Sequence, residues 1–295
     1  MRTLANKVLF YAALASTGFG VVSCEQAGEA LQDRKKRENE QEIEQYIDRN
    51  NLRGQVQKNE LGLYYYITKS VPNGQQPKIG DQVQYHYVAR RLDNLIVDST
   101  DIAANKPLSF VYLDRPVNIT AGLFLGITQL KEGEEAILLV PAYLDNGRIG
   151  TLLLPQYSPV RYDLKVVNVR TEDEQIEDYI KAKKLAVTQK QDNGLRVAVT
   201  QSRPDSVLIT TGKTVNVKYT GKLLNDTQFD AGTINVVIGE GRVVKGWEEA
   251  LQKLRAGEKA TIVFPSALGY GTQGSGQTIG PYAPLAFDLE IMSVK

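Results

Sequence analysis

The chain has 295 residues, of which 42% are hydrophobic and 23% charged, a composition typical of globular proteins and long enough for two domains. Its formal net charge of +1 argues against the extended basic surface of a nucleic-acid-binding protein. One cysteine excludes a disulfide within the chain, and one histidine, His86, leaves little for histidine-based catalysis. His86 alternates with Tyr85 and Tyr87 along a predicted strand, so we expect it to point outward.

Residues 1–23 have the layout of a secretory signal peptide. A short basic start is followed by an apolar or small run from Val8 to Val22, which is shorter than the roughly 20 residues that a membrane-spanning helix needs. The run ends in Val21-Val22-Ser23-Cys24, which resembles a bacterial lipobox, whose cysteine is lipidated and becomes the first residue of the mature protein. We therefore expect lipidation of Cys24; the alternative is an uncleaved anchor with a buried cysteine.

Residues 24–55 are rich in charge and predict a tether that ends in a lead helix. The basic run at residues 33–37 has acidic neighbours, which favours a solvated helix over a membrane-surface patch. Ile43, Tyr46 and Ile47 give this helix one apolar edge for docking. The same apolar pattern returns at residues 175–180.

That return belongs to an internal repeat. Tyr219 lies 132 positions after Tyr87 in a matching strand pattern, and Trp247 lies 124 positions after Leu123 beside a matching glycine. We therefore predict two copies of one module, each led by a helix. The first copy covers residues 56–170, and the second covers residues 171–295 with its lead helix.

The second copy predicts a sheet with one buried face and one short helix laid on that face. Residues 215–219, 260–264 and 285–291 alternate between apolar and polar side chains, as half-buried strands do. After Gly246, a short helix would carry four side chains on one apolar face, namely Trp247, Ala250, Leu251 and Leu254.

Several motifs recur in order in this copy: Val217-Lys-Tyr219-Thr-Gly221, Phe229-Asp230, Val243-Val-Lys-Gly-Trp247-Glu-Glu249, Phe264-Pro265, Gly269-Tyr-Gly271, Ile279 and Leu285-Ala-Phe287-Asp288. Together they resemble the FKBP family of peptidyl-prolyl isomerases. The resemblance implies an α+β fold, in which each copy is a curved antiparallel sheet wrapped on a short helix. It also implies peptidyl-prolyl cis-trans isomerase activity on proline-containing polypeptides.

The resemblance assigns a role to each position of a binding pocket. Trp247 would be its floor, the amide of Val244 would hold a substrate carbonyl, and Asp230 and the Tyr270 hydroxyl would be polar contacts at the rim. The walls would be Tyr219, Phe229, Val243, Ile279 and Phe287. The chain departs from the family at Ile234, where an aromatic residue is usual, and at Gly280, where the family has a proline. Both departures bear on peptide preference and macrolide affinity.

The first copy keeps the scaffold and changes the pocket. Leu123 replaces Trp247, Val97 replaces Phe229 and Asn146 replaces Tyr270 at the corresponding positions of the first copy. The first copy retains Tyr87, Asp98 and Tyr162. We expect this copy to be a degenerate domain that binds or spaces, because function follows from site residues and not from the fold.

The run Gly269-Tyr-Gly271-Thr-Gln-Gly274 matches a dinucleotide-binding fingerprint, but that motif must open a helix. Further glycines and prolines follow it here, so we predict a glycine-rich loop from Tyr270 to Pro281, which we call the flap.

Twisting a prolyl amide in a dry pocket needs no cofactor or metal, because such a pocket favours the less polar twisted form. We therefore predict an isomerase that assists the folding of exported proteins, with its activity in the second copy, no cofactor and no nucleic-acid partner. The alternative is a non-catalytic peptide-binding chaperone or interaction module. A lipid on Cys24 would tether the protein to the membrane of a bacterial cell envelope, and Glu25, in place of an aspartate, favours the outer membrane, on its periplasmic or surface face.

Overall fold

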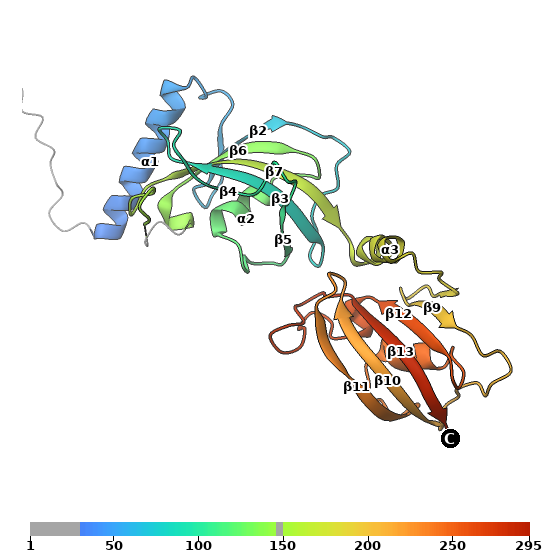
Figure 1. The fold of residues 1–295 in the computed structure, drawn as a ribbon. Coiled ribbons are helices and arrows are strands. Elements are labelled where there is room, and N and C mark those ends of the chain that lie inside the picture. Colours follow the sequence, from blue (N-terminus) through green and yellow to red (C-terminus); the bar gives the residue numbers. More distant parts are fainter. Residues whose placement is uncertain (1–29, 146–149) are drawn as a thin grey trace, which may run out of the picture.

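The computed structural model describes residues 30–145 and 150–295, which form two antiparallel sheets with helices packed against them (Figure 1). The helices are α1 (Leu31–Arg49), α2 (Ala121–Ile127), α3 (Glu172–Lys183) and α4 (Lys245–Leu251). The strands of the first copy are β1 (Gln57–Lys58), β2 (Tyr64–Lys69), β3 (Gln82–Arg90), β4 (Ile96–Ser99), β5 (Leu108–Val111), β6 (Glu135–Val140) and β7 (Val160–Arg170). Those of the second are β8 (Gln189–Lys190), β9 (Arg196–Gln201), β10 (Thr214–Leu223), β11 (Gln228–Val237), β12 (Lys259–Phe264) and β13 (Leu285–Val294).

The two sheets have the same strand order. The first runs β1-β2-β6-β7-β3-β4, with β5 also paired to β3, and the second runs β8-β9-β12-β13-β10-β11. All pairings are antiparallel. The predicted α+β class, with two copies of one sheet-and-helix module, is confirmed. The predicted signal peptide, Cys24 and Asn146 lie outside the described residues.

Each lead helix packs on the outer face of its own sheet, opposite the short inner helix. In α1, Ile43, Tyr46 and Ile47 are buried against side chains of β2 and β6. In α3, Ile176 and Tyr179 are buried against β12 and β13. The central strand β12 is therefore covered on both faces, which explains why it is nearly continuously buried. Within the described ranges, no helix is long and apolar enough to cross a membrane.

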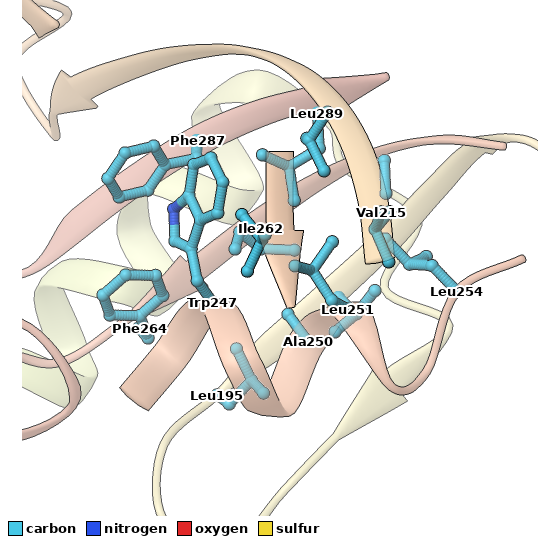
Figure 2. Packing of buried hydrophobic residues seen from close by; sticks show 14 of the residues in the cluster. Leu195, Val215, Trp247, Ala250, Leu251, Leu254, Ile262, Phe264, Phe287 and Leu289 are labelled. Atoms are coloured by element: carbon cyan, nitrogen blue, oxygen red, sulfur yellow. The ribbon is translucent and has the colours of Figure 1, made fainter. Parts of the chain in front are cut away.

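The core of the second copy lies between α4 and the inner face of its sheet (Figure 2). Trp247, Ala250 and Leu251 share one side of α4 and point at the strands, as their spacing predicts. The helix ends at Leu251, so Leu254 belongs to the turn that follows, yet it is also fully buried. Burying each large side chain of this kind stabilises the fold by about 1.5–3 kcal/mol.

His86 points away from the core that holds Tyr85 and Tyr87, as expected of an outward strand residue, but it is not exposed to solvent. Its side chain is only 7% exposed, with Nδ1 2.8 Å from Thr100 Oγ1 and Nε2 3.3 Å from Asn105 Oδ1. The reason is a loop between β4 and β5, closed by a bridge between Asp101 and Lys106, whose residues Thr100 and Asn105 contact both ring nitrogens. The second copy has no such loop, because β11 is continuous there.

Candidate functional site

A cavity of about 370 Å³ opens beside the N-terminal end of α4, and we call it the pocket. It is lined by eight of the nine predicted site residues: Tyr219, Phe229, Asp230, Val243, Val244, Trp247, Tyr270 and Phe287. The ninth, Ile279, does not line it but is buried in the hydrophobic core to which Trp247 belongs. Three further lining residues are Ile234, Gly241 and Arg242. The structure thus brings the predicted residues together, although their roles stay predictions.

The floor and walls are aromatic rings set edge to face. The Trp247 ring lies 5.0 Å from Tyr219 and 5.2 Å from Phe287, centroid to centroid, at interplanar angles of 83° and 89°. Phe229 meets Phe287 at 5.5 Å and 86°. Edge-to-face pairs at these distances contribute about 0.5–1.5 kcal/mol beyond their buried area. The rings therefore hold one another in place and give the pocket a firm apolar floor.

Two glycines allow the rings to approach the backbone this closely. A Cβ on Gly246 would lie 2.6 Å from the ring of Phe264, and one on Gly221 would lie 2.6 Å from Phe287 and 2.7 Å from Phe229. Real Cβ atoms do not come so near, so larger residues would displace the rings. Neither glycine was among the predicted site residues. A comparison of the two copies carries the signal for Gly221, since Ala89 occupies its place in the first copy.

The rim is organised by a pair of polar side chains. The Tyr219 hydroxyl donates a hydrogen bond to Asp230 Oδ2 at 2.8 Å. This bond, together with burial and the charge of Asp230, raises the pKa of Tyr219 above its usual 10.0, so the phenol stays neutral at physiological pH. Asp230 was predicted as a polar contact at the rim, and one of its oxygens already accepts a hydrogen bond from the Tyr219 hydroxyl. The partly exposed Tyr270 also lines the pocket.

The loop before α4 is held by the helix that follows it. Gly241 donates its backbone N–H to Glu248 Oε1 at 2.9 Å, and its φ of +67° is in the left-handed region that favours glycine. Val244 is the N-cap residue of α4, and its apolar side chain makes no capping hydrogen bond. Its backbone N–H therefore lies at a helix terminus next to the pocket, where a substrate carbonyl could accept from it.

One polar atom of the floor has no partner. The indole Nε1 of Trp247 is buried and meets no hydrogen-bond acceptor in the described part of the chain. An unmet buried donor costs about 1–3 kcal/mol. Such costs persist mainly where a site needs the side chain for another reason.

The first copy arranges the same positions differently. Tyr87 donates to Asp98 at 2.5 Å, as Tyr219 does to Asp230, but Leu123 takes the place of the indole. Tyr162 stands where Phe287 does, and its hydroxyl bonds to Asp145. Burial and the neighbouring carboxylates raise the pKa of both tyrosines. The polar pair is thus retained, while the apolar cage is replaced.

Aromatic volume has also moved within the first core. Tyr85 stands at the position of Val217, is buried, and stacks on Tyr87 with ring centroids 6.2 Å apart. Its ring also meets Phe110 edge to face at 5.9 Å. The larger Tyr85 on the sheet therefore offsets the smaller Leu123 on α2, and the first core is filled from the sheet instead of from the helix.

The pocket can bind an apolar ring against aromatic walls and can orient an amide with the groups at its rim. Within residues 30–145 and 150–295, no group of three His, Cys, Asp or Glu side chains is placed to hold a metal ion.

Comparisons with known proteins point to one family. A family model described as FKBP-type peptidyl-prolyl cis-trans isomerase matches residues 73–167 and 206–292. The "FK506-binding protein" of Neisseria meningitidis serogroup B is 39% identical over 88 residues, which are 28% of this chain and 81% of that protein. Human "Peptidyl-prolyl cis-trans isomerase FKBP9" is 27% identical over 221 residues, which are 73% of this chain and 35% of that protein. A crystal structure of the three FKBP domains of wheat FKBP73 covers 81% of this chain and 98% of its own, with 22% identity and a TM-score of 0.40.

Proposed function

Because the chain belongs to the FKBP-type peptidyl-prolyl cis-trans isomerase family, we propose that its second copy, residues 171–295, carries the isomerase activity, and that its substrates are exported polypeptides. The observation that carries this proposal is the aromatic cage of the second copy. Trp247, Phe229 and Phe287 line a pocket there, whereas Leu123, Val97 and Tyr162 occupy these places in the first copy.

The chemistry follows from the properties of the prolyl amide. Its rotation is slow because amide resonance must be broken, at a barrier of about 18–20 kcal/mol. The planar amide is the more polar form, so it loses more hydration free energy than the twisted form when both leave water for an apolar site. The proline ring would lie over Trp247, and the Val244 N–H would hold the preceding carbonyl. A thousandfold acceleration needs about 4 kcal/mol of transition-state stabilisation, which several such contacts supply jointly.

The first copy has a different part in this proposal. Its Tyr87–Asp98 pair is intact at the rim, but Leu123 and Val97 no longer provide the aromatic floor and wall. It binds polypeptide weakly or spaces the second copy from the membrane. The competing function for the whole chain, a non-catalytic peptide-binding module, is favoured by the same retained pair.

A prolyl-peptide isomerisation assay on the full chain separates the two functions. We expect acceleration that is clearly reduced in Phe229→Val, which reproduces the first copy's residue, and that is unchanged in Val97→Ala. No acceleration over the uncatalysed rate would favour the binding module. Equal losses in both variants would place activity in both copies.

We further propose that the protein is a lipoprotein of a bacterial envelope, anchored by a lipid on Cys24 after removal of residues 1–23. The support is the Val21-Val22-Ser23-Cys24 boundary after an apolar run, and Glu25 favours the outer membrane. Six residues then separate the anchor from Leu31 at the start of α1. At about 3.3–3.6 Å per extended residue, this tether would keep the start of the lead helix within roughly 25 Å of the bilayer.

The anchor has a direct test. Cys24→Ala should move the protein from the membrane fraction to the soluble fraction, because the lipid is its main attachment, and metabolic labelling with a radioactive fatty acid should disappear. Cys24→Ala protein that stays on membranes in high salt would contradict lipid anchoring.

A further inference from the structure

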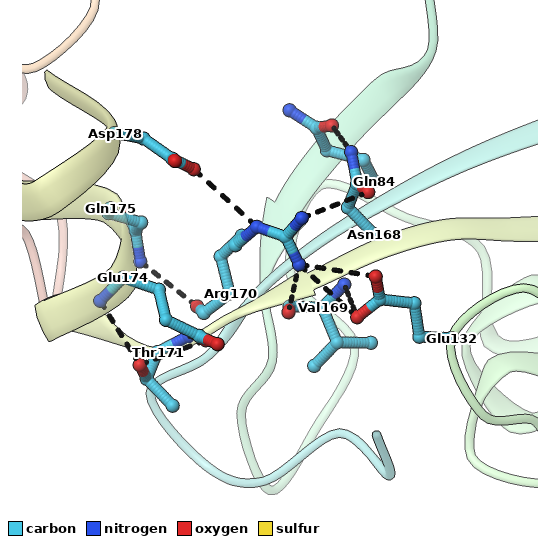
Figure 3. A network of polar contacts seen from close by, with 9 residues as sticks. All are labelled: Gln84, Glu132, Asn168, Val169, Arg170, Thr171, Glu174, Gln175 and Asp178. Atoms are coloured by element: carbon cyan, nitrogen blue, oxygen red, sulfur yellow. Dashed lines mark hydrogen bonds and ion pairs between the residues drawn. The ribbon is translucent and has the colours of Figure 1, made fainter. Parts of the chain in front are cut away.

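The linking helix α3 is fastened to the first copy by the last residue of β7 (Figure 3). Arg170 Nη1 lies 3.2 Å from both carboxylate oxygens of Glu132, and Arg170 Nε lies 3.5 Å from Asp178 of α3. Gln175 of α3 donates to the Arg170 carbonyl at 3.2 Å. Thr171 and Glu174 close a capping box at the start of the helix. The first turn of α3 is therefore fixed relative to the first sheet.

The same turn also reaches the second copy through Glu172. Its carboxylate accepts the backbone N–H of Ser266 at 2.5 Å and the Ser266 hydroxyl at 2.8 Å. Ser266 is only 4% exposed and begins the single-turn 3-10 helix that leads into the flap. Burial raises the pKa of Glu172, although both hydrogen bonds from Ser266 act to lower it. Hydrogen bonds to a charged partner are stronger than neutral ones, so this is a firm attachment.

Ser266 in turn shapes the beginning of the flap. Its carbonyl accepts the backbone N–H of Gly269 and of Gly271, both at 2.8 Å. Tyr270 lies between these glycines and lines the pocket. Just beyond the other end of the flap, the backbone N–H of Tyr282 donates to the Gly271 carbonyl at 3.0 Å, which ties the two ends together. Glu172 therefore acts on the turn that carries Tyr270 through a single intervening residue, Ser266.

The residue that follows the flap touches the first copy directly. A Cβ on Gly80 would lie 2.9 Å from the ring of Tyr282, so the turn before β3 is in close contact with the segment just after the flap. Gly80 has a φ of +97°, a conformation that L side chains rarely adopt.

The first copy contains a corresponding attachment. Asn39 of α1 is buried, accepts the backbone N–H of Ala142 at 2.7 Å, and donates to the Tyr157 carbonyl at 2.7 Å. Asn39 precedes Glu172 by 133 positions, as Tyr46 precedes Tyr179 in the two lead helices, and Ala142 precedes Ser266 by 124, as Leu123 precedes Trp247. Each lead helix therefore uses one polar side chain to hold the segment that follows the corresponding strand, β6 in the first copy and β12 in the second. The attachment is a property of the module, and in the second copy the segment that it holds continues to Tyr270, which lines the pocket.

We propose that Glu172 is a positioning residue for the isomerase: it fixes the turn that carries Tyr270, and through α3 it links the geometry of the pocket to the first copy. The proposal rests on the proposed activity of the second copy. It explains why a copy without the aromatic cage stays joined to one that has it.

The test uses the full chain and three substitutions, with kcat and KM measured separately on a prolyl peptide. Glu172→Ala should lower kcat/KM by roughly three- to tenfold, because its effect passes through Tyr270, whose hydroxyl can contribute about tenfold. Glu172→Gln should restore most of the rate, since its amide can still accept from the Ser266 N–H. Asn39→Ala is the matched control; it removes the corresponding attachment in the first copy and should leave the rate unchanged.

Two readouts separate positioning from general destabilisation. In Glu172→Ala, amide hydrogen exchange at Gly269 and Gly271 should quicken while core amides of β12 stay protected. In a Tyr270→Phe background, Glu172→Ala should cost little more, because the two changes act on one contact. Unchanged exchange at both glycines, or an equal loss of rate in Asn39→Ala, would overturn the proposal. The proposed function fails separately, if Phe229→Val leaves the rate intact.

Discussion

The two copies of the module share a strand order and a lead helix, but they place their aromatic side chains differently. In the second copy Trp247 and Phe229 surround an open cavity. In the first copy Tyr85 fills the core beneath the sheet, and Leu123 replaces the indole. The fold is therefore stable with either arrangement, and the pocket is a feature that the core tolerates and does not require.

Backbone clearance accompanies the change in side chains. Gly221 pairs with Phe287 across β10 and β13, and Ala89 pairs with Tyr162 at the corresponding place on β3 and β7. The glycine leaves room for two rings. In the first copy the alanine pairs with Asp98 on the neighbouring strand, and the smaller Val97 stands at the place of Phe229. The residue at one of these positions therefore limits the size of the side chains at the others, and the two copies differ at all of these positions together.

The substitution with the largest expected effect transfers the first copy's floor to the second. Trp247→Leu removes two edge-to-face contacts and lets water reach the floor, so kcat/KM should fall by more than tenfold. The lost burial should also lower the free energy of unfolding by about 2–4 kcal/mol. Peptide isomerisation kinetics and urea denaturation measure the two effects.

Leu123→Ala is the control at the matching position of the first copy. It should cost about 2–5 kcal/mol of stability in that copy without reducing the rate. A Trp247→Leu variant that keeps its full rate would show that the indole serves only the core.

Periodicity predicted the fold, because it reports which face of an element is buried, whereas the pocket residues were predicted from the resemblance to a family. The spacing of Trp247, Ala250 and Leu251 was enough to orient α4, and ordered motifs brought together eight lining residues. Periodicity does not report what covers the opposite face, and for this reason the burial of His86 beneath the β4–β5 loop was missed.

The contacts of Glu172 were missed for a related reason. Its partner Ser266 is 94 residues away in the chain, and a glutamate in the first turn of a helix is common in any case. Comparing the copies position by position offers a partial signal, because Asn39 falls at the corresponding place in α1. The Tyr219–Asp230 hydrogen bond likewise joins two strands whose register the sequence alone does not fix.

An intermediate effect is expected when backbone clearance is removed. Gly221→Ala would bring a Cβ within 2.6 Å of Phe287 and 2.7 Å of Phe229, so both rings must shift. We expect a loss of about 1–3 kcal/mol in stability from overpacking, and a fall of roughly fivefold to tenfold in kcat/KM.

A second substitution sharpens this comparison between the copies. Adding Phe229→Val to Gly221→Ala reproduces the pair found in the first copy, Ala89 with Val97. The double variant should regain part of the stability that Gly221→Ala loses, with a coupling of about 0.5–3 kcal/mol in a double-mutant cycle, yet it should not regain activity. Strict additivity of the two changes would mean that the glycine serves some other purpose.

The smallest effect is expected at the polar pair that both copies retain. Asp230→Asn keeps an acceptor for the Tyr219 hydroxyl and removes only the charge, so kcat/KM should change by less than fivefold. The hydrogen bond to Asp230 raises the pKa of Tyr219 above 10.0, so the phenol is protonated throughout the neutral range. A raised folded-state pKa contributes stability that is present below the unfolded value and is lost as pH rises through the folded value; any pH effect from this tyrosine therefore belongs to alkaline solution. We expect a rate that is flat from about pH 6 to 8 in both the wild type and Asp230→Asn, because twisting an amide in a dry pocket transfers no proton.

A bell-shaped profile in that range, or a loss beyond a thousandfold in Asp230→Asn, would instead indicate acid–base catalysis. The difference in activity between the copies would then have to lie outside the aromatic cage, since Asp98 and Tyr87 form the same hydrogen-bonded pair in the copy without that cage.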